Sequence, residues 1–186
     1  MTRARDLASY TTLTTLTGTQ TLTNKTLTSP ITNTATINTP TITDGTITNA
    51  TENYATFVSP TETGNVVASA ATGTINFNFE TSSVWYYTSN ASANFTLNFR
   101  YNSSTTLASK LSVGESITVV FMNTNGTTAY YPNVIQIDGT TVTPKIQGGT
   151  AITAGNASSI DAYSFTILKT AATPTYLVLE SQSKFA

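Results

Sequence analysis

The chain of 186 residues contains no cysteine and no histidine, and charged residues make up only 9% of it. Without cysteine, disulfides and thiol catalysis are excluded; without histidine, the commonest general base and a frequent zinc ligand are missing. The net charge is −1, which implies no electrostatic attraction to nucleic acid or to an anionic membrane. We therefore expect a protein that is not an enzyme, that holds no metal or other cofactor, and that does not bind nucleic acid.

Long apolar runs are also missing. No stretch reaches the roughly 18 consecutive apolar residues of a membrane span, and the first ten residues, MTRARDLASY, lack the apolar segment of a secretory signal. The sequence predicts neither membrane insertion nor a signal peptide. We expect a protein that is made in the cytoplasm and reaches any exterior by another route.

What the chain does contain is threonine, concentrated in a repeat. Residues 21–50 form six pentads, TLTNK TLTSP ITNTA TINTP TITDG TITNA. Each pentad holds one larger apolar residue: Leu22, Leu27, Ile31, Ile37, Ile42 and Ile47. A period of five fits neither a helix nor an alternating strand, so the pattern indicates a repeat architecture, and threonine favours extended backbone.

A single copy of this repeat buries too little apolar surface to fold alone. Ordering costs about 1–2 kcal/mol per residue, and one apolar side chain in five residues does not offset it. Several chains winding into a β-helix-like shaft would place the six apolar residues on a common axis. The alternative interpretation is a disordered Thr/Asn-rich linker.

The composition changes after the repeat. Residues 51–65 form a polar linker with one apolar patch, Tyr54–Val58, and residues 66–186 are long enough for one domain with its own core. Apolar and polar residues alternate at 75–79 and 95–99, and continuous apolar runs occupy 84–87 and 117–122. Further strands are predicted at 130–138, 141–143, 163–169 and 176–179, with a hairpin turn at Asp138-Gly139 and a short helical turn at 106–111.

These elements predict an all-β fold: a repetitive multi-chain β shaft followed by an antiparallel β-sandwich, or jelly-roll-like, head. The expected loops of the head are 89–94, 101–109, 123–128 and 145–159. They are rich in Asn, Ser, Thr and Gly, which offer neutral hydrogen-bonding groups for weak contacts with sugar hydroxyls.

Two aromatic clusters are candidates for contact with a glycan or with another subunit. They are Trp85-Tyr86-Tyr87 and Tyr130-Tyr131. Neighbouring residues of a strand point to opposite faces, so one member of each cluster must face away from the local core. Rings with a polar tip suit glycan stacking as well as subunit interfaces.

The acids available for catalysis are scattered. Glu80, Glu115, Asp138 and Asp161 belong to no recognisable motif, and a glycoside hydrolase would need two of them within about 5–9 Å. A polysaccharide-degrading enzyme is therefore the weakest of the interpretations, and no site for a metal or a cofactor is predicted.

Two stretches resemble proteins of bacteriophage particles. Gly18–Pro30, GTQTLTNKTLTSP, resembles a segment common in phage tail fibres. Ala68–Arg100, ASAATGTINFNFETSSVWYYTSNASANFTLNFR, resembles the terminal domain of virion proteins from phages of marine bacteria. The similarity continues through Gly114–Phe121, Gly148-Gly149 and Asn156–Asp161.

This resemblance implies a trimeric structural protein of the virion. We expect a short homotrimeric fibre that displays its head, with host-surface attachment as a candidate role. Residues 1–20 would bind other virion proteins, with Leu7 and Tyr10 as apolar anchors. The alternative is a capsid or neck decoration protein that stabilises the particle. The position on the particle, the receptor and the neighbours of the head are left open by the sequence.

Overall fold

The computed structural model describes residues 56, 58 and 60–186. Contacts divide the chain into two units, Met1–Ala55 and Thr56–Ala186. The pentad shaft with its six apolar residues, the anchors Leu7 and Tyr10, and residues 51–55, 57 and 59 of the linker therefore lie outside the described residues.

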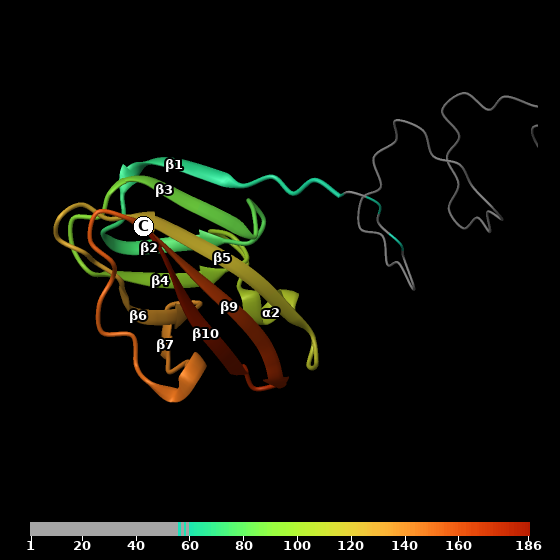
Figure 1. Ribbon diagram of the computed structural model, residues 1–186. Helices are drawn as coiled ribbons and strands as arrows, with labels where there is room; N and C mark the ends of the chain where they lie inside the picture. The colour runs from blue at the N-terminus through green and yellow to red at the C-terminus, as the bar shows by residue number, and fades with distance from the viewer. Residues whose placement is uncertain (1–55, 57, 59) are drawn as a thin grey trace, which may run out of the picture. The chain divides into compact units, whose positions relative to one another are not determined.

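The described part of the chain is almost entirely β structure (Figure 1). Its strands are β1 (Asn65–Ala70), β2 (Gly73–Asn78), β3 (Val84–Asn90), β4 (Phe95–Arg100), β5 (Ser116–Thr124), β6 (Pro132–Ile137), β7 (Thr140–Val142), β8 (Lys145–Ile146), β9 (Ile160–Ala171) and β10 (Thr175–Phe185). Two single helical turns, α2 (Leu107–Lys110) and η2 (Gln147–Gly149), complete it. The all-β prediction is confirmed for this unit.

The strands form two sheets. A six-stranded sheet has the order β1-β3-β5-β9-β10-β8, and a four-stranded sheet has the order β2-β4-β6-β7. From β1 to β6 the chain crosses from one sheet to the other at every step, so that odd strands enter the larger sheet and even strands the smaller one. The result is three successive coils, β1–β2, β3–β4 and β5–β6 (Figure 1).

The antiparallel prediction is wrong for these coils. β1 pairs with β3, β3 with β5, β2 with β4 and β4 with β6, all in parallel, because each coil returns in the same direction. Antiparallel pairing is confined to β5 with β9, β9 with β10, and β6 with β7. The apolar–polar alternation places one face of each strand in the core but carries no information about the direction of its neighbour.

The two sheets enclose one hydrophobic core. Phe77 of the smaller sheet stacks on Trp85 of the larger one, with ring centroids 4.9 Å apart. Phe99 meets Phe165 edge-on, also at 4.9 Å. Both contacts cross the interface between the sheets, so the predicted alternation of Ile75–Phe79 and Phe95–Phe99 supplies the inner face of the smaller sheet.

The predicted turn and helix are both confirmed. Asp138 and Gly139 have φ angles of +50° and +80°, the left-handed pair that a two-residue type I′ hairpin between β6 and β7 requires. The Asp138 carboxylate also accepts hydrogen bonds from the amides of Leu107 and Ala108, at 2.8 and 3.0 Å. It thereby binds the first turn of α2 to the hairpin.

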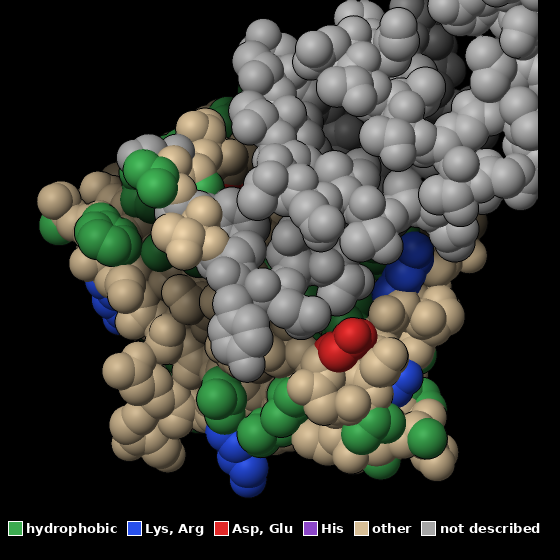
Figure 2. Space-filling model, turned by 90° about the vertical axis from the view of Figure 1, so that its right-hand side faces the viewer, with side chains coloured by type: hydrophobic (Ala, Val, Ile, Leu, Met, Phe, Trp, Pro, Cys, Tyr) green, Lys and Arg blue, Asp and Glu red, His purple; other side chains and the backbone are tan. Residues whose placement is uncertain are grey.

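Within the described residues, no helix is long and apolar enough to cross a bilayer. Charged side chains are also sparse and well separated on the side of the domain that Figure 2 shows. The part of that surface which Figure 2 shows for the described residues is formed mainly by uncharged polar groups and backbone, with scattered apolar side chains.

Candidate functional site

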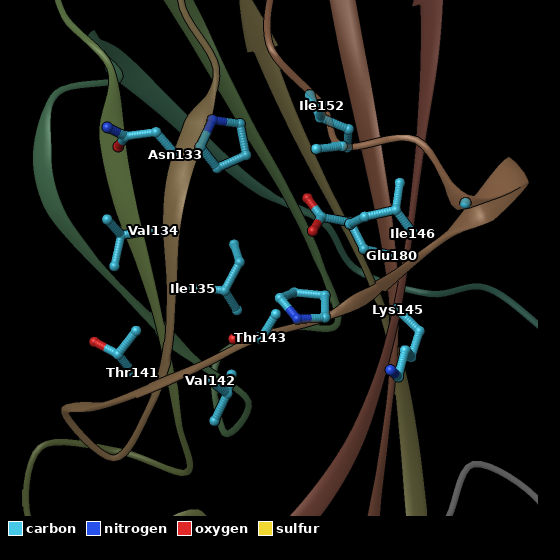
Figure 3. A pocket seen from close by; sticks show the side chains of 14 residues that line it. Asn133, Val134, Ile135, Thr141, Val142, Thr143, Lys145, Ile146, Ile152 and Glu180 are labelled. Atoms are coloured by element: carbon cyan, nitrogen blue, oxygen red, sulfur yellow. The ribbon is translucent and has the colours of Figure 1, made fainter.

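A pocket of about 540 Å³ opens where the smaller sheet ends, between β6 and β7 on one side and β8 and β10 on the other (Figure 3). The segment that follows η2 forms part of its wall. Seven larger aliphatic or proline side chains line it: Pro132, Val134, Ile135, Val142, Pro144, Ile146 and Ile152. Asn133, Thr141, Thr143 and Lys145 add polar groups to the lining. The volume lies in the range typical of small-molecule sites. We call it the Glu180 pocket, after the acid within it.

The strand pairing explains how an acid comes to face this pocket. Along β10, Val178 points into the core, and Glu180, two residues later, points in the same direction. Glu180 pairs with Phe165 of β9 and with Ile146 of β8, so apolar residues flank it on both sides. Its side chain is only 6% exposed.

Three charged side chains are buried in the described part of the chain: Asp161, Lys169 and Glu180. The Lys169 ammonium donates to the carbonyl oxygens of Ala108 and Leu111, both at 2.7 Å. Asp161 also has several hydrogen-bonding partners. Within the described residues, the structure gives the Glu180 carboxylate neither a hydrogen bond nor an ion pair.

Burial without a partner disfavours the charged form of Glu180. Desolvation raises the pKa of this carboxyl to about 7. Lys145 also lines the pocket, but its side chain points away from the Glu180 carboxylate in Figure 3. Near neutral pH the carboxyl therefore exists in both states, and no described residue supplies a counter-charge to its ionised form.

Asp161 lies in a contrasting environment one strand away. One carboxylate oxygen, Oδ2, accepts hydrogen bonds from the Asn125 side chain at 3.0 Å and from the Asn156 amide at 2.8 Å. Tyr163 and Gln182 donate to the same oxygen at longer range, 3.4 and 3.5 Å. Burial raises the pKa of Asp161, and these bonds and the Lys184 charge oppose the rise.

This buried cluster also holds two oxygens without partners. They are Oδ1 of Asp161 and Oδ1 of Asn123, and the two residues lie directly opposite each other on β9 and β5. Gly155 packs against the cluster so closely that an added Cβ would lie 2.6 Å from the Tyr130 carbonyl and 2.8 Å from Asp161 Oδ2. The chain here is closed around the carboxylate, unlike the open Glu180 pocket.

The first aromatic cluster divides between the two faces of β3. Trp85 is 7% exposed, stacks on Phe77 and donates its indole N–H to the Ser82 carbonyl at 3.2 Å. Tyr87 packs against Phe121, with centroids 5.4 Å apart. Tyr86 points outward, and its hydroxyl lies 3.1 Å from that of Thr124. Of the three, Tyr86 is the ring that the surface presents.

The second aromatic cluster precedes β6 instead of lying within it. Tyr130 and Tyr131 are half-buried and pack against the core. The Tyr130 amide donates to Asn125 and the Tyr131 amide to Asn94. The predicted strand therefore begins two residues late, at Pro132. Neither aromatic cluster lines the Glu180 pocket.

The remaining acids have local roles. Asp138 binds α2 to the hairpin, Glu80 accepts a hydrogen bond from Asn102, and Glu115 accepts one from the Ser112 amide. None of the three lines the Glu180 pocket. Across the described ranges, no group of three or more His, Cys, Asp or Glu side chains could hold a metal ion.

Glu180 was not among the residues that the sequence singled out, although a signal was present. Tyr176–Leu179 is a continuous apolar run, and Glu180 follows it directly, two residues after Val178 and therefore on the same face of the strand. An acid at an inward position of a strand is a candidate for a buried, perturbed carboxyl. The predicted loop 145–159 was the other indication, because its first residues line the pocket.

No family model, no curated protein and no solved structure matches this chain. The geometry of the described unit therefore has to support any assignment of function on its own.

Proposed function

We propose that this chain is a structural protein of a phage particle, a short trimeric fibre whose C-terminal domain is a binding head for the host surface. The pentad repeat supports the trimeric fibre, because one copy of it buries too little to fold. The observation that supports the proposal most strongly in the described unit is the outer face of the six-stranded sheet.

This outer face carries no charge over five strands. The outward positions of β1, β3, β5, β9 and β10 are all uncharged, because the charged residues of these strands, Asp161, Lys169, Glu180 and Lys184, occupy inward positions. The sixth strand, β8, adds one charge at the edge of this face, since Lys145 pairs with the outward Leu179. Several of the outward side chains are apolar and well exposed, including Val66 at 67%, Leu179 at 45% and Phe185 at 58%. We call this surface the uncharged face.

The uncharged face is suited to contact with further copies of the same chain. Five strands about 4.8 Å apart and about seven residues long span on the order of 500 Å², which approaches the ~800 Å² that each partner buries in a stable interface. Symmetry-related copies that meet here bring no like charges together. Val66, Tyr86, Met122 and Ala162 lie in one row across it, so we propose Tyr86 as a subunit contact.

The outer face of the smaller sheet differs. It carries a polar row in which the Asn98 amide donates to Asn76 at 2.8 Å, and Arg100 donates to Asn78 at 2.7 Å. This comparison provides a matched test of the trimer, because Thr118 is exposed on the uncharged face and Thr74 is exposed on the smaller sheet.

The test is sedimentation equilibrium of the full chain with one glutamate added on either face. We expect a trimer for the unaltered protein and for Thr74→Glu, and dissociation for Thr118→Glu. Leu27→Asp and Ile42→Asp, in the pentads, should also dissociate the trimer or make it aggregate. A stable, folded monomer of the unaltered full chain would refute the trimeric fibre.

The same face and loops would equally suit packing against neighbouring virion proteins, as a decoration protein requires. Cell-adsorption measurements with the full chain, together with imaging of the intact virion, distinguish the two roles. Adsorption that the soluble protein blocks supports a binding head. A head that is buried against capsid or neck proteins, with no adsorption, supports decoration.

A further inference from the structure

We infer that the Glu180 pocket binds a primary ammonium group carried on a short aliphatic stem, with the Glu180 carboxylate as its counter-ion. The inference rests on the proposed role of this domain as a binding head, and it names the chemistry of the ligand. It follows from the charge, the walls and the orientation of the pocket.

Within the described residues, no group is paired with the Glu180 carboxylate. The other two buried charged groups of the described unit are hydrogen-bonded within the fold, Lys169 by two carbonyls and Asp161 by side chains and a backbone amide. Glu180 alone faces a pocket without such a partner. A buried ionised carboxylate is stabilised by a cation that donates hydrogen bonds to it, and a bound ammonium group supplies both.

The walls of the pocket select an aliphatic ligand. Its seven large apolar lining residues are Ile, Val and Pro, and no aromatic ring is among the residues that line it. Sugars are commonly held by stacking on aromatic rings, the role for which Tyr86, Tyr87, Tyr130 and Tyr131 are candidates. Aliphatic walls around one carboxylate instead match a methylene stem that ends in a charged amine, the arrangement of a lysine side chain.

The orientation of the two charged lining residues favours an external cation. Figure 3 shows the Glu180 carboxylate directed toward the pocket beside Ile152 and Ile146, whereas the Lys145 side chain extends away from it. Lys145 pairs with Leu179 and Glu180 with Ile146, so their side chains leave β8 and β10 on opposite faces of the sheet. The protein's own nearby ammonium therefore leaves the carboxylate free for a ligand.

Proton linkage predicts how the affinity changes with pH. A cationic ligand binds the ionised carboxylate in preference to the neutral acid, and burial raises the pKa of Glu180 to about 7. Binding should therefore strengthen as the pH rises toward 7 and level off above it. Below pH 7 the affinity should fall by up to about tenfold for each unit, until binding through the neutral acid dominates.

The experiment is a titration of the isotope-labelled full chain, followed by the NMR signals of the Glu180 side chain and the pocket methyl groups. The probes are n-butylammonium as the proposed chemistry, n-butanol as its neutral analogue, butyrate as its anionic analogue, and glucosamine as an amine on a sugar. We expect n-butylammonium to bind most tightly, more tightly at pH 8 than at pH 5.5, and to lower the pKa of Glu180 as it binds.

Two variants and a control separate the contribution of the carboxylate to binding from that of the apolar walls. Glu180→Gln keeps the shape of the side chain but removes its charge. It should lower the affinity for n-butylammonium by about tenfold or more and abolish the pH dependence of binding. Ile152→Ser should lower the affinity for n-butylammonium and change the affinity for glucosamine less. Glu80→Gln, at an exposed acid remote from the pocket lining, should bind like the unaltered protein.

Several results would overturn the inference. Equal affinities for n-butanol and n-butylammonium would mean that the carboxylate does not select the ligand. A higher affinity for glucosamine than for n-butylammonium would mean that the aliphatic walls do not select it either. The pH series on the unaltered protein decides the question even if Glu180→Gln fails to fold. If the protein binds the amine but does not adsorb to cells, the Glu180 pocket is still an ammonium-binding site, but the domain is not a host-binding head.

Discussion

Asp161 and Glu180 lie on adjacent strands, both point between the sheets, and both are buried, yet their surroundings differ in kind. The chain folds tightly around Asp161, where amides, a hydroxyl and the close approach of Gly155 occupy one carboxylate oxygen. Around Glu180 it leaves a pocket with aliphatic walls. Burial raises the pKa of both carboxyls, but hydrogen bonds oppose that rise only at Asp161.

The Asp161 carboxylate therefore stabilises the fold through its hydrogen bonds, whereas the Glu180 carboxylate remains free to bind a ligand. Removing a hydrogen-bonded buried group leaves its partners unsatisfied, whereas neutralising an unpartnered one relieves a desolvation cost. Substitutions at the two sites should therefore change the free energy of unfolding in opposite directions.

The largest effect is expected from Asp161→Ala. It removes the acceptor for the Asn125 side chain and the Asn156 amide in a site that is 0% exposed. We expect a loss of about 4 kcal/mol in the free energy of unfolding, measured by urea denaturation of the full chain. Ser164→Ala, at an outward position of the same strand, is the control and should cost little. A loss below about 1 kcal/mol would contradict the structural role.

Glu180→Gln should increase the free energy of unfolding instead of lowering it, and the size of the increase should depend on pH. Because the folded pKa is about 7 and the ordinary value is 4.5, the folded state binds more protons than the unfolded state between these values. The unaltered protein therefore loses stability as the pH rises through that window, and the variant does not. We expect the stability of the variant relative to the unaltered protein to increase by about 3 kcal/mol between pH 4 and pH 8.

Urea denaturation at the two pH values measures that difference, and Glu80→Gln provides the control. Glu80 is exposed and accepts a hydrogen bond from Asn102, so this variant should follow the unaltered protein at both values. Parallel pH profiles for Glu180→Gln and the unaltered protein would show that Glu180 does not carry the proposed desolvation cost.

Gly155→Ala tests how tightly the chain closes around Asp161. An added Cβ would lie 2.6 Å from the Tyr130 carbonyl oxygen and 2.9 Å from the Asn125 amide nitrogen, closer than van der Waals contact allows. We expect a loss of about 2 kcal/mol by thermal or urea unfolding. Gly64→Ala, whose Cβ would meet its nearest atom at 3.7 Å, should be nearly neutral; equal losses at both positions would contradict the close packing.

Tyr163→Phe should have the smallest effect. The hydroxyl of Tyr163 lies 3.4 Å from Asp161 Oδ2 and accepts a hydrogen bond from Gln182 at 3.1 Å. Asp161 keeps its two shorter bonds in this variant. We therefore expect a loss of about 1 kcal/mol in chemical denaturation, and a loss as large as that of Asp161→Ala would place the centre of the cluster at Tyr163 instead.

The sequence predicted the elements of this domain far better than their partners. Ile75, Phe77 and Phe79 alternate with asparagines, and this period alone identifies a half-buried strand. Its parallel neighbour is β4, and that pairing depends on the path of the chain through both sheets. The same turn signals are compatible with a hairpin and with a coil, so the antiparallel expectation had no local evidence against it.

The candidate site was less predictable still. Glu180 is recognisable as an acid at an inward position, but its missing partner is a property of the surrounding space. The pocket combines β6, β7, β8, β10 and the segment after η2, which are brought together only by tertiary folding. For Trp85 the sequence left glycan contact and core packing open, and the structure places its ring in the core against Phe77.

The mixture of a local hairpin with non-local coils also has a kinetic consequence. β9 and β10 pair from Ala171 with Thr175 to Ile160 with Phe185 around one short turn, so their association closes only a small loop. The coils pair Asn65 with Trp85 and Val84 with Val120, which requires long stretches of chain to be closed first. The last part of the domain to be synthesised is thus the part expected to order first, and the three coils would assemble against it.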